Sequence, residues 1–114
     1  MAFDKAKALK IWKTVCKVPS GKVSSYGFIA DLAGLPGRAR LVGKILQYAP
    51  DKMNVPWHRI LKSNGQLAFA AGSKSAELQK GLLQEEGVVV LNNRVKLKAF
   101  GWNPRLGELM ELEF

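Results

Sequence analysis

The chain has 114 residues, of which 47% are hydrophobic, and a sequence of this size suits one compact domain with a modest core. Its 18 lysines and arginines against 9 aspartates and glutamates give a formal net charge of +9, which favours a polyanion such as nucleic acid as partner. A single cysteine excludes an intramolecular disulfide and a cysteine-rich metal site, and no apolar run reaches the roughly 18 residues of a membrane span.

The first predicted element is a helix over residues 4–17, which ends there because the residue before Pro19 is pushed out of the helical region. Apolar side chains recur within it at helical spacing, which predicts a face that packs inward. The residues assigned to this face are Leu9, Trp12, Val15 and Cys16. A reactive role for Cys16 is the alternative, and it requires an exposed, electropositive setting.

The next two predicted helices form a helix-turn-helix. Ser24 or Ser25 caps a short helix that runs to Ala33, and Gly34 supplies its left-handed ending. After a turn at residues 35–37, the second helix covers residues 38–48. Its spacing predicts one buried face and one polar face. The buried residues are Leu41, Val42, Ile45 and Leu46, and the polar face carries Arg40, Lys44 and Gln47.

A glycine inside this second helix calls for a compensating role, since it costs roughly 1 kcal/mol relative to alanine. Ala39 and Gly43 are four residues apart, so they form a flat strip beside Arg40 and Lys44. A flat strip lets a helix press its backbone against DNA. Close helix packing within the protein is the alternative explanation.

The second half of the chain predicts two hairpins and a helix. Residues 60–62 and 66–67 flank a Ser-Asn-Gly turn, which indicates a short hairpin. A fourth helix begins at Ser73 or Ser75 and ends at Gly87. Its predicted apolar face consists of Leu78, Leu82 and Leu83. Residues 88–91 and 94–97 surround two asparagines and predict a second small hairpin or wing, whereas the tail from Gly101 to Phe114 is ambiguous.

Several ordered segments resemble the O6-alkylguanine-DNA alkyltransferases over nearly the whole chain. They are PSGKVSSYG at 19–27, ARLVG at 39–43, PWHRI at 56–60, SNG at 63–65, AG at 71–72 and LLQEEG at 82–87. The transferases have a nucleophilic cysteine where this chain has Trp57, and an indole cannot accept an alkyl group. The sequence therefore resembles the alkyltransferase-like branch of the family, whose members bind alkylated DNA without repairing it.

The resemblance implies a mainly α fold with small β hairpins, a winged-helix-like helix-turn-helix domain like the C-terminal domain of DNA alkyltransferases. We expect a single domain over residues 1–114. In the family the recognition helix enters the minor groove, an arginine fills the space of the extruded nucleotide, and a tyrosine pushes the adjoining phosphate. Arg40 and Tyr26 match these two positions. The full set of expected DNA-binding residues is Ser25, Tyr26, Ala39, Arg40, Gly43 and Lys44.

The resemblance also implies a pocket for the flipped base. The expected lining is Tyr26, Trp57, Ala70, Ala71 and Gly72, and the expected structural support is Pro56, His58, Arg59 and Glu86. His58 and Glu86 match the residues that activate the thiolate in transferases, but here we expect them to form structural hydrogen bonds only. Ala49 replaces a family asparagine. Ala70 and Ala71 replace hydroxyl-bearing residues, so recognition should rely on backbone donors, apolar fit and volume, with room for bulkier alkyl groups.

These features predict a non-enzymatic sensor that binds and flips O6-alkylguanine in duplex DNA and marks it for nucleotide excision repair. The expected partners are that DNA and the damage-recognition proteins of the repair pathway. We expect a monomer without metal or cofactor, located in the cytoplasm and associated with the nucleoid if the source is bacterial. The alternative is a small helix-turn-helix transcriptional regulator that binds undamaged DNA, although no obvious dimer element is present.

Overall fold

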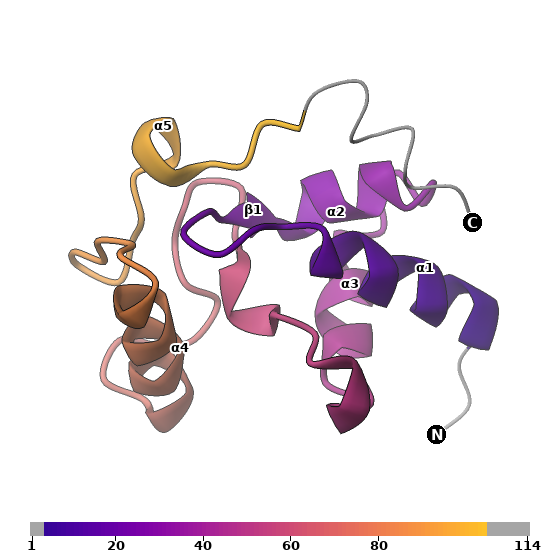
Figure 1. Cartoon of the computed structure of the whole chain (residues 1–114), viewed down its shortest axis with the longest axis horizontal. Helices are drawn as coiled ribbons and strands as arrows, with labels where there is room; N and C mark the ends of the chain where they lie inside the picture. The colour runs from indigo at the N-terminus through magenta and orange to yellow at the C-terminus, as the bar shows by residue number, and fades with distance from the viewer. Residues whose placement is uncertain (1–3, 105–114) are drawn as a thin grey trace.

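The computed structural model describes residues 4–104, and Figure 1 shows two groups of elements joined by a central segment. The helices α1 (Lys5–Cys16), α2 (Tyr26–Leu32) and α3 (Ala39–Leu46) lie together at one end. Helix α4 (Lys74–Glu85) lies at the other end, and the short α5 (Leu97–Phe100) follows it. Between them run two 3-10 turns, η1 (Asp51–Met53) and η2 (Trp57–Arg59). No helix within residues 4–104 is long and apolar enough to cross a membrane.

The predicted caps and turns of the helix-turn-helix are confirmed. The Ser25 hydroxyl accepts a hydrogen bond of 3.1 Å from the Phe28 N–H and so caps α2. Gly34, at a φ of 77°, ends this helix as expected. Helix α3 buries Val42 and Ile45, whereas the predicted Leu41 and Leu46 are only partly buried against the same core. The Trp12 Nε1–H of α1 donates to the Ile45 carbonyl at 3.0 Å. The three helices therefore share one core.

The predicted inward face of α1 is partly wrong. Trp12 and Val15 are buried, but Leu9 is 42% exposed and Cys16 is also exposed. The buried apolar residues of α1 follow the i, i+3, i+4, i+7 pattern. Leu9 and Cys16 each follow a buried residue by one position, which turns their side chains about 100° around the helix axis and away from the core. The buried apolar residues are Ala8, Ile11, Trp12 and Val15.

A two-stranded parallel sheet connects the helix-turn-helix to the central segment. Strand β1 (Ser24–Ser25) pairs with β2 (Ile60–Leu61), with Ser24 opposite Ile60. The predicted Ser-Asn-Gly turn is present, because the Gly65 N–H donates to the Lys62 carbonyl at 2.9 Å. The Lys62 N–H also donates to the Gln66 carbonyl at 2.9 Å, so the hairpin is present at its turn. It does not extend further, because β2 pairs with β1 instead. Turn residues report a local bend and carry no information about a partner far away in the chain.

The second predicted hairpin is confirmed as a minimal one. Leu91 and Arg94 exchange both backbone hydrogen bonds, at 2.9 and 3.0 Å. Asn92 and Asn93 between them have φ values of 52° and 60°, as a type I′ turn requires. Gly65 has a φ of 88°, and a Cβ there would collide with the Val95 carbonyl. This glycine therefore permits the close backbone approach that joins the hairpin to the rest of the fold.

Helix α4 begins as predicted but buries a different face. The Ser73 hydroxyl accepts from the Ala76 N–H at 3.2 Å, which decides between the two candidate serines. Leu83 is buried, whereas Leu78 is 57% exposed, and Gln79 is fully buried in its place. A second core lies under this helix. Its buried members are Val23, Leu61, Leu67, Ala76, Leu83, Val88, Val90 and Val95.

Candidate nucleic-acid interface

A cavity of about 1010 Å³ opens between α3, the η2 turn and the loop that follows β2. Five predicted site residues line it, namely Tyr26, Ala39, Arg40, Gly43 and Trp57. The helix-turn-helix and the tryptophan motif are distant in sequence, and the cavity is where their side chains meet. This convergence is the central feature of the site.

Tyr26 stands at the start of α2, close to the glycine of α3. Partial burial raises the pKa of its phenol, so the hydroxyl is neutral at physiological pH and free of repulsion from a phosphate. A Cβ at Gly43 would lie 3.7 and 3.9 Å from two Tyr26 ring carbons, which is ordinary van der Waals contact. Packing within the described protein therefore does not demand a glycine at this position, which favours the flat-strip explanation over close helix packing.

The exposed face of α3 carries the predicted cations. Arg40, Lys44 and Gln47 are all exposed, as their spacing predicted. Arg40 borders the cavity, whereas Lys44 lies outside the cavity lining. Ser25 also lies outside it, and its hydroxyl oxygen is engaged as the cap of α2.

Trp57 occupies the η2 turn and forms part of the cavity wall. Its ring makes edge contacts with two others: the His58 centroid is 6.1 Å away at 85°, and the Phe69 centroid is 6.3 Å away at 84°. Pro56, just before it, is buried. The indole is thus held by rings on two sides while part of it faces the open cavity.

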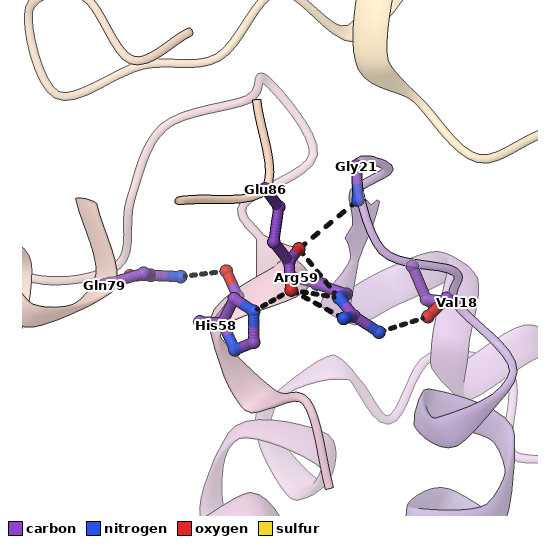
Figure 2. A network of polar contacts seen from close by, with 6 residues as sticks. All are labelled: Val18, Gly21, His58, Arg59, Gln79 and Glu86. Atoms are coloured by element: carbon purple, nitrogen blue, oxygen red, sulfur yellow. Dashed lines mark hydrogen bonds and ion pairs between the residues drawn. The ribbon is translucent and has the colours of Figure 1, made fainter. Parts of the chain in front are cut away.

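The carboxylate of Glu86 contacts both of the next two side chains of the motif, His58 and Arg59 (Figure 2). His58 Nε2 lies 2.9 Å from Glu86 Oε2, and Arg59 Nη2 lies 2.6 Å from the same oxygen. The Gly21 N–H donates to Glu86 Oε1 at 3.3 Å, and Arg59 Nη1 donates to the Val18 carbonyl at 2.8 Å. One carboxylate thereby joins the end of α4, the motif and the loop after α1.

These contacts set the protonation of the network. The Arg59 guanidinium first, and then the His58 and Gly21 donors, lower the pKa of Glu86 to about 2, although burial opposes them. The ionised carboxylate only accepts hydrogen bonds, so His58 Nε2 must carry a proton and donate. The predicted structural hydrogen bonding of these residues is therefore present in the geometry.

Gln79 is a supporting residue that sequence reasoning missed. Its side-chain amide donates to the carbonyls of His58 and Ile60 at 3.0 and 3.2 Å, and it is fully buried. The amide fixes the motif backbone to α4. A glutamine within a polar helix is typical of a solvent-facing position, so composition alone gives no signal for this role.

The comparisons with known proteins agree with this architecture. Residues 6–88 match the family model of the 6-O-methylguanine DNA methyltransferase DNA-binding domain. The chain belongs to this family.

Relatives in this family include alkyltransferase-like and DNA base-flipping proteins. Alkyltransferase-like protein 1 of Schizosaccharomyces pombe is 36% identical over 100 residues, which cover 83% of this chain and 93% of that protein. The DNA base-flipping protein of Vibrio parahaemolyticus is 36% identical over 97 residues, covering 84% of this chain and 95% of that one. The crystal structure of S. pombe Atl1 with damaged DNA containing O6-carboxymethylguanine has a TM-score of 0.79 and 35% identity, over 91% of this chain and 100% of that chain. The predicted resemblance and fold class are confirmed.

Three predicted pocket residues of this alkyltransferase-like chain lie outside the cavity lining. Ala70, Ala71 and Gly72 are all exposed, in a turn that the Ser73 N–H closes by donating to the Ala70 carbonyl at 3.0 Å. Their contact with a flipped base stays a prediction. The same loop lines the cavity with residues that were not predicted, Ala68 and Phe69, and Lys62 and Leu78 add to the wall. An aromatic residue in a loop of small residues was the available signal for Phe69.

Cys16 lies on the other side of the motif, beside a smaller cavity of about 460 Å³ that Pro56 and Trp57 also line. Partial burial raises the pKa of its thiol, although the nearby Arg59 opposes this shift. A raised pKa reduces the thiolate fraction and hence the nucleophilicity. The exposed position is therefore not an activated one. Within residues 4–104, no group of three acidic, histidine or cysteine side chains is placed to hold a metal ion.

Proposed function

We propose that this chain is a non-enzymatic sensor of DNA damage that binds duplex DNA containing O6-alkylguanine and holds the altered base out of the helix. One observation carries the proposal: a single cavity is lined both by Arg40 on the exposed face of α3 and by Trp57 at the family's nucleophile position. A base cannot be inspected within the stack, and extruding it costs a few kcal/mol. A site that reads a base this way needs a group to fill the gap and a pocket to receive the base.

Five residues that line the cavity each have a role in this proposed mechanism. The flat strip of Ala39 and Gly43 brings α3 against the minor groove, and the exposed Arg40 enters the base stack. The neutral phenol of Tyr26 meets the adjoining phosphate and helps rotate the nucleotide. The extruded base then enters the cavity and packs against the Trp57 indole.

The indole offers no thiol to accept an alkyl group, so the complex persists instead of reacting. We propose that this persistence is the signal, and that the damage-recognition proteins of nucleotide excision repair are the partners that read it. S. pombe Atl1, the relative crystallised with O6-carboxymethylguanine DNA, supports the choice of lesion. The net charge of +9 supports a DNA partner.

Binding to matched duplexes with guanine or O6-methylguanine at one position tests the proposal at fixed salt. We expect tighter binding to the lesion and no transfer of a labelled methyl group to the protein. Equal affinity for both duplexes would favour the regulator of undamaged DNA. Stoichiometric labelling of the protein would instead reveal an enzyme.

A further inference from the structure

The segment over residues 88–91, which follows α4, alternates between buried and exposed side chains. Val88 and Val90 are buried in the second core, whereas Val89 is 52% exposed and Leu91 is 68% exposed. This period of two is that of a strand, so the exposed pair lies on one side of the segment. Scattered apolar side chains are ordinary on a protein surface, but two on one side of a short segment form a patch that is stabilised when a ligand covers it.

The backbone of this segment has hydrogen-bonding groups without a partner. The two arms of the hairpin pair at the turn, where Leu91 and Arg94 exchange their backbone hydrogen bonds. The N–H and C=O groups of Val89 and Val90, just before the turn, form no hydrogen bond with any residue in the range 4–104. Such groups bind water or another chain, and an unpaired strand is a template on which a second strand can form.

The surroundings of the segment are basic. Residues 87–104 contain Arg94, Lys96 and Lys98 and no acidic residue, and all three cations are exposed. None of the three forms an ion pair with a residue in the part of the chain that the structure describes. Their uncompensated charge favours a partner that carries carboxylates.

The segment lies away from the proposed DNA-binding helix. Residues 88–91 and the three cations are outside the lining of the large cavity, and the segment follows α4 at the end of the molecule away from α3 (Figure 1). A partner can therefore reach it while DNA occupies α3. Residues 88–91 extend over only about 13 Å, at about 3.3 Å per residue. This length suits one peptide-like segment better than a second copy of the chain, because a stable dimer buries about 1,200 Å² or more.

We propose that residues 88–91 bind an extended, acidic segment of a partner protein by strand addition. The backbone of that segment pairs with the free groups of Val89 and Val90, and its carboxylates lie beside the cations. In this mode the backbone hydrogen bonds provide affinity, and alternate side chains, here Val89 and Leu91, provide specificity. An apolar centre with charges around it favours a protein over DNA, because interfaces with DNA are more polar. The inference goes beyond the proposed function, since the segment binds its partner whether or not DNA carries a lesion.

A fluorescent hexapeptide of alternating glutamate and valine tests this inference with the whole chain. Anisotropy measures its binding, and NMR follows the backbone amide signals of Val89 and Val90. We expect a Kd below about 1 mM and shifts of these two signals. Two further peptides carry N-methyl groups on alternate amides, in one phase or in the other. Strand pairing uses the amides of one edge only, so one of these peptides should bind about tenfold more weakly and the other should change less than about twofold.

A protein variant tests the apolar contact. Leu91→Ser should weaken binding of the unmethylated peptide about fivefold, because it removes buried apolar area from the complex. Leu9→Ser is the matched control, because Leu9 is 42% exposed and lies on α1. It should bind the peptide like the unmodified protein. Urea unfolding of both variants at an unchanged midpoint verifies that they are folded.

Equal binding of the two methylated peptides would overturn strand addition, as would the absence of binding at about 1 mM peptide. Displacement of the peptide by a saturating guanine duplex would make the cations DNA contacts instead. A dimer in sedimentation that Leu91→Ser abolishes would replace the partner protein with a second copy. Failure of the lesion-binding test would overturn the proposed function and leave the peptide result standing.

Discussion

The two sides of the Pro-Trp-His-Arg motif differ in how completely their groups are satisfied. On the inner side, His58 and Arg59 share one carboxylate, and their side chains are only 12% and 16% exposed. On the outer side, Trp57 faces an open cavity with exposed apolar neighbours. The inner, closed side fixes the position of the motif backbone through its hydrogen bonds. The outer, open side leaves the Trp57 indole partly accessible in the cavity. We therefore propose that the motif has a structural half, which holds its backbone in place, and a recognition half, which contacts the ligand.

The largest expected effect comes from breaking the closed side with Glu86→Gln. The pKa of Glu86 is lowered from 4.5 to about 2, so its ionised form stabilises the fold by about 3 kcal/mol above pH 4.5. That stability should disappear as the pH falls from about 4.5 to about 2. We expect the variant to lose about 2 to 3 kcal/mol at pH 7 and most of this acid dependence, measured by urea unfolding.

Glu85→Gln is the matched control, because Glu85 is exposed and adjacent in the chain. It should unfold like the unmodified protein. A Glu86→Gln variant with unchanged stability and pH profile would mean that the inner network contributes little to folding.

The open side is broken by Arg40→Ala. If this guanidinium replaces the extruded nucleotide, the variant should lose about 1 to 3 kcal/mol of binding to the lesion duplex and most of the preference over guanine. Arg38→Ala removes the same charge at an exposed position outside the cavity lining, and should weaken both duplexes by a smaller, equal factor. Fluorescence anisotropy at matched salt measures both. Parallel losses for Arg40→Ala would make it a phosphate contact only.

The smallest change in methyl-transfer activity is expected from Trp57→Cys, which places a cysteine at the family's nucleophile position. In-line attack needs the sulfur about 3 to 3.5 Å from the alkyl carbon, and a misplacement of about 1 Å costs roughly a hundredfold. Removing the indole also takes away the ring that packs against Phe69 and His58. We expect weakened lesion binding and no efficient methyl transfer.

A labelled O6-methylguanine duplex measures that transfer, with a cysteine-containing methyltransferase of the family as positive control. Rapid, stoichiometric labelling of the variant would show that the pocket is still organised for chemistry.

The helix-turn-helix was predictable because its signals are local. A capping Ser25, a left-handed Gly34 and the periodicity of α3 each act over a few residues, and the structure confirms all three. The pairing of β1 with β2 was not predictable in this way, because it joins residues 36 positions apart, from Ser24 to Ile60.

The residues of the candidate site show the same difference between signals that the sequence carries and contacts that only the fold creates. The resemblance supplied Tyr26, Arg40 and Trp57, which meet in one cavity. It did not supply Gln79 or Phe69, whose roles depend on a buried hydrogen bond and a ring contact between distant segments. Such contacts arise only when the chain is folded. The sequence gives no signal for the role of Gln79, and its only signal for Phe69 is an aromatic residue among small ones.

The short parallel sheet also limits how this protein can diversify. Tyr26, the first residue of α2, follows β1 directly and Trp57 stands three residues before β2, so one backbone ladder fixes the spacing between the start of α2 and the tryptophan motif. On the proposed mechanism, we expect any substitution that shifts this spacing to disturb DNA docking and lesion binding together. The exposed residues of the loop at 68–72 have no such constraint from the ladder. Lineages, or protein engineers, in search of a new lesion range should therefore find most of their workable changes in that loop.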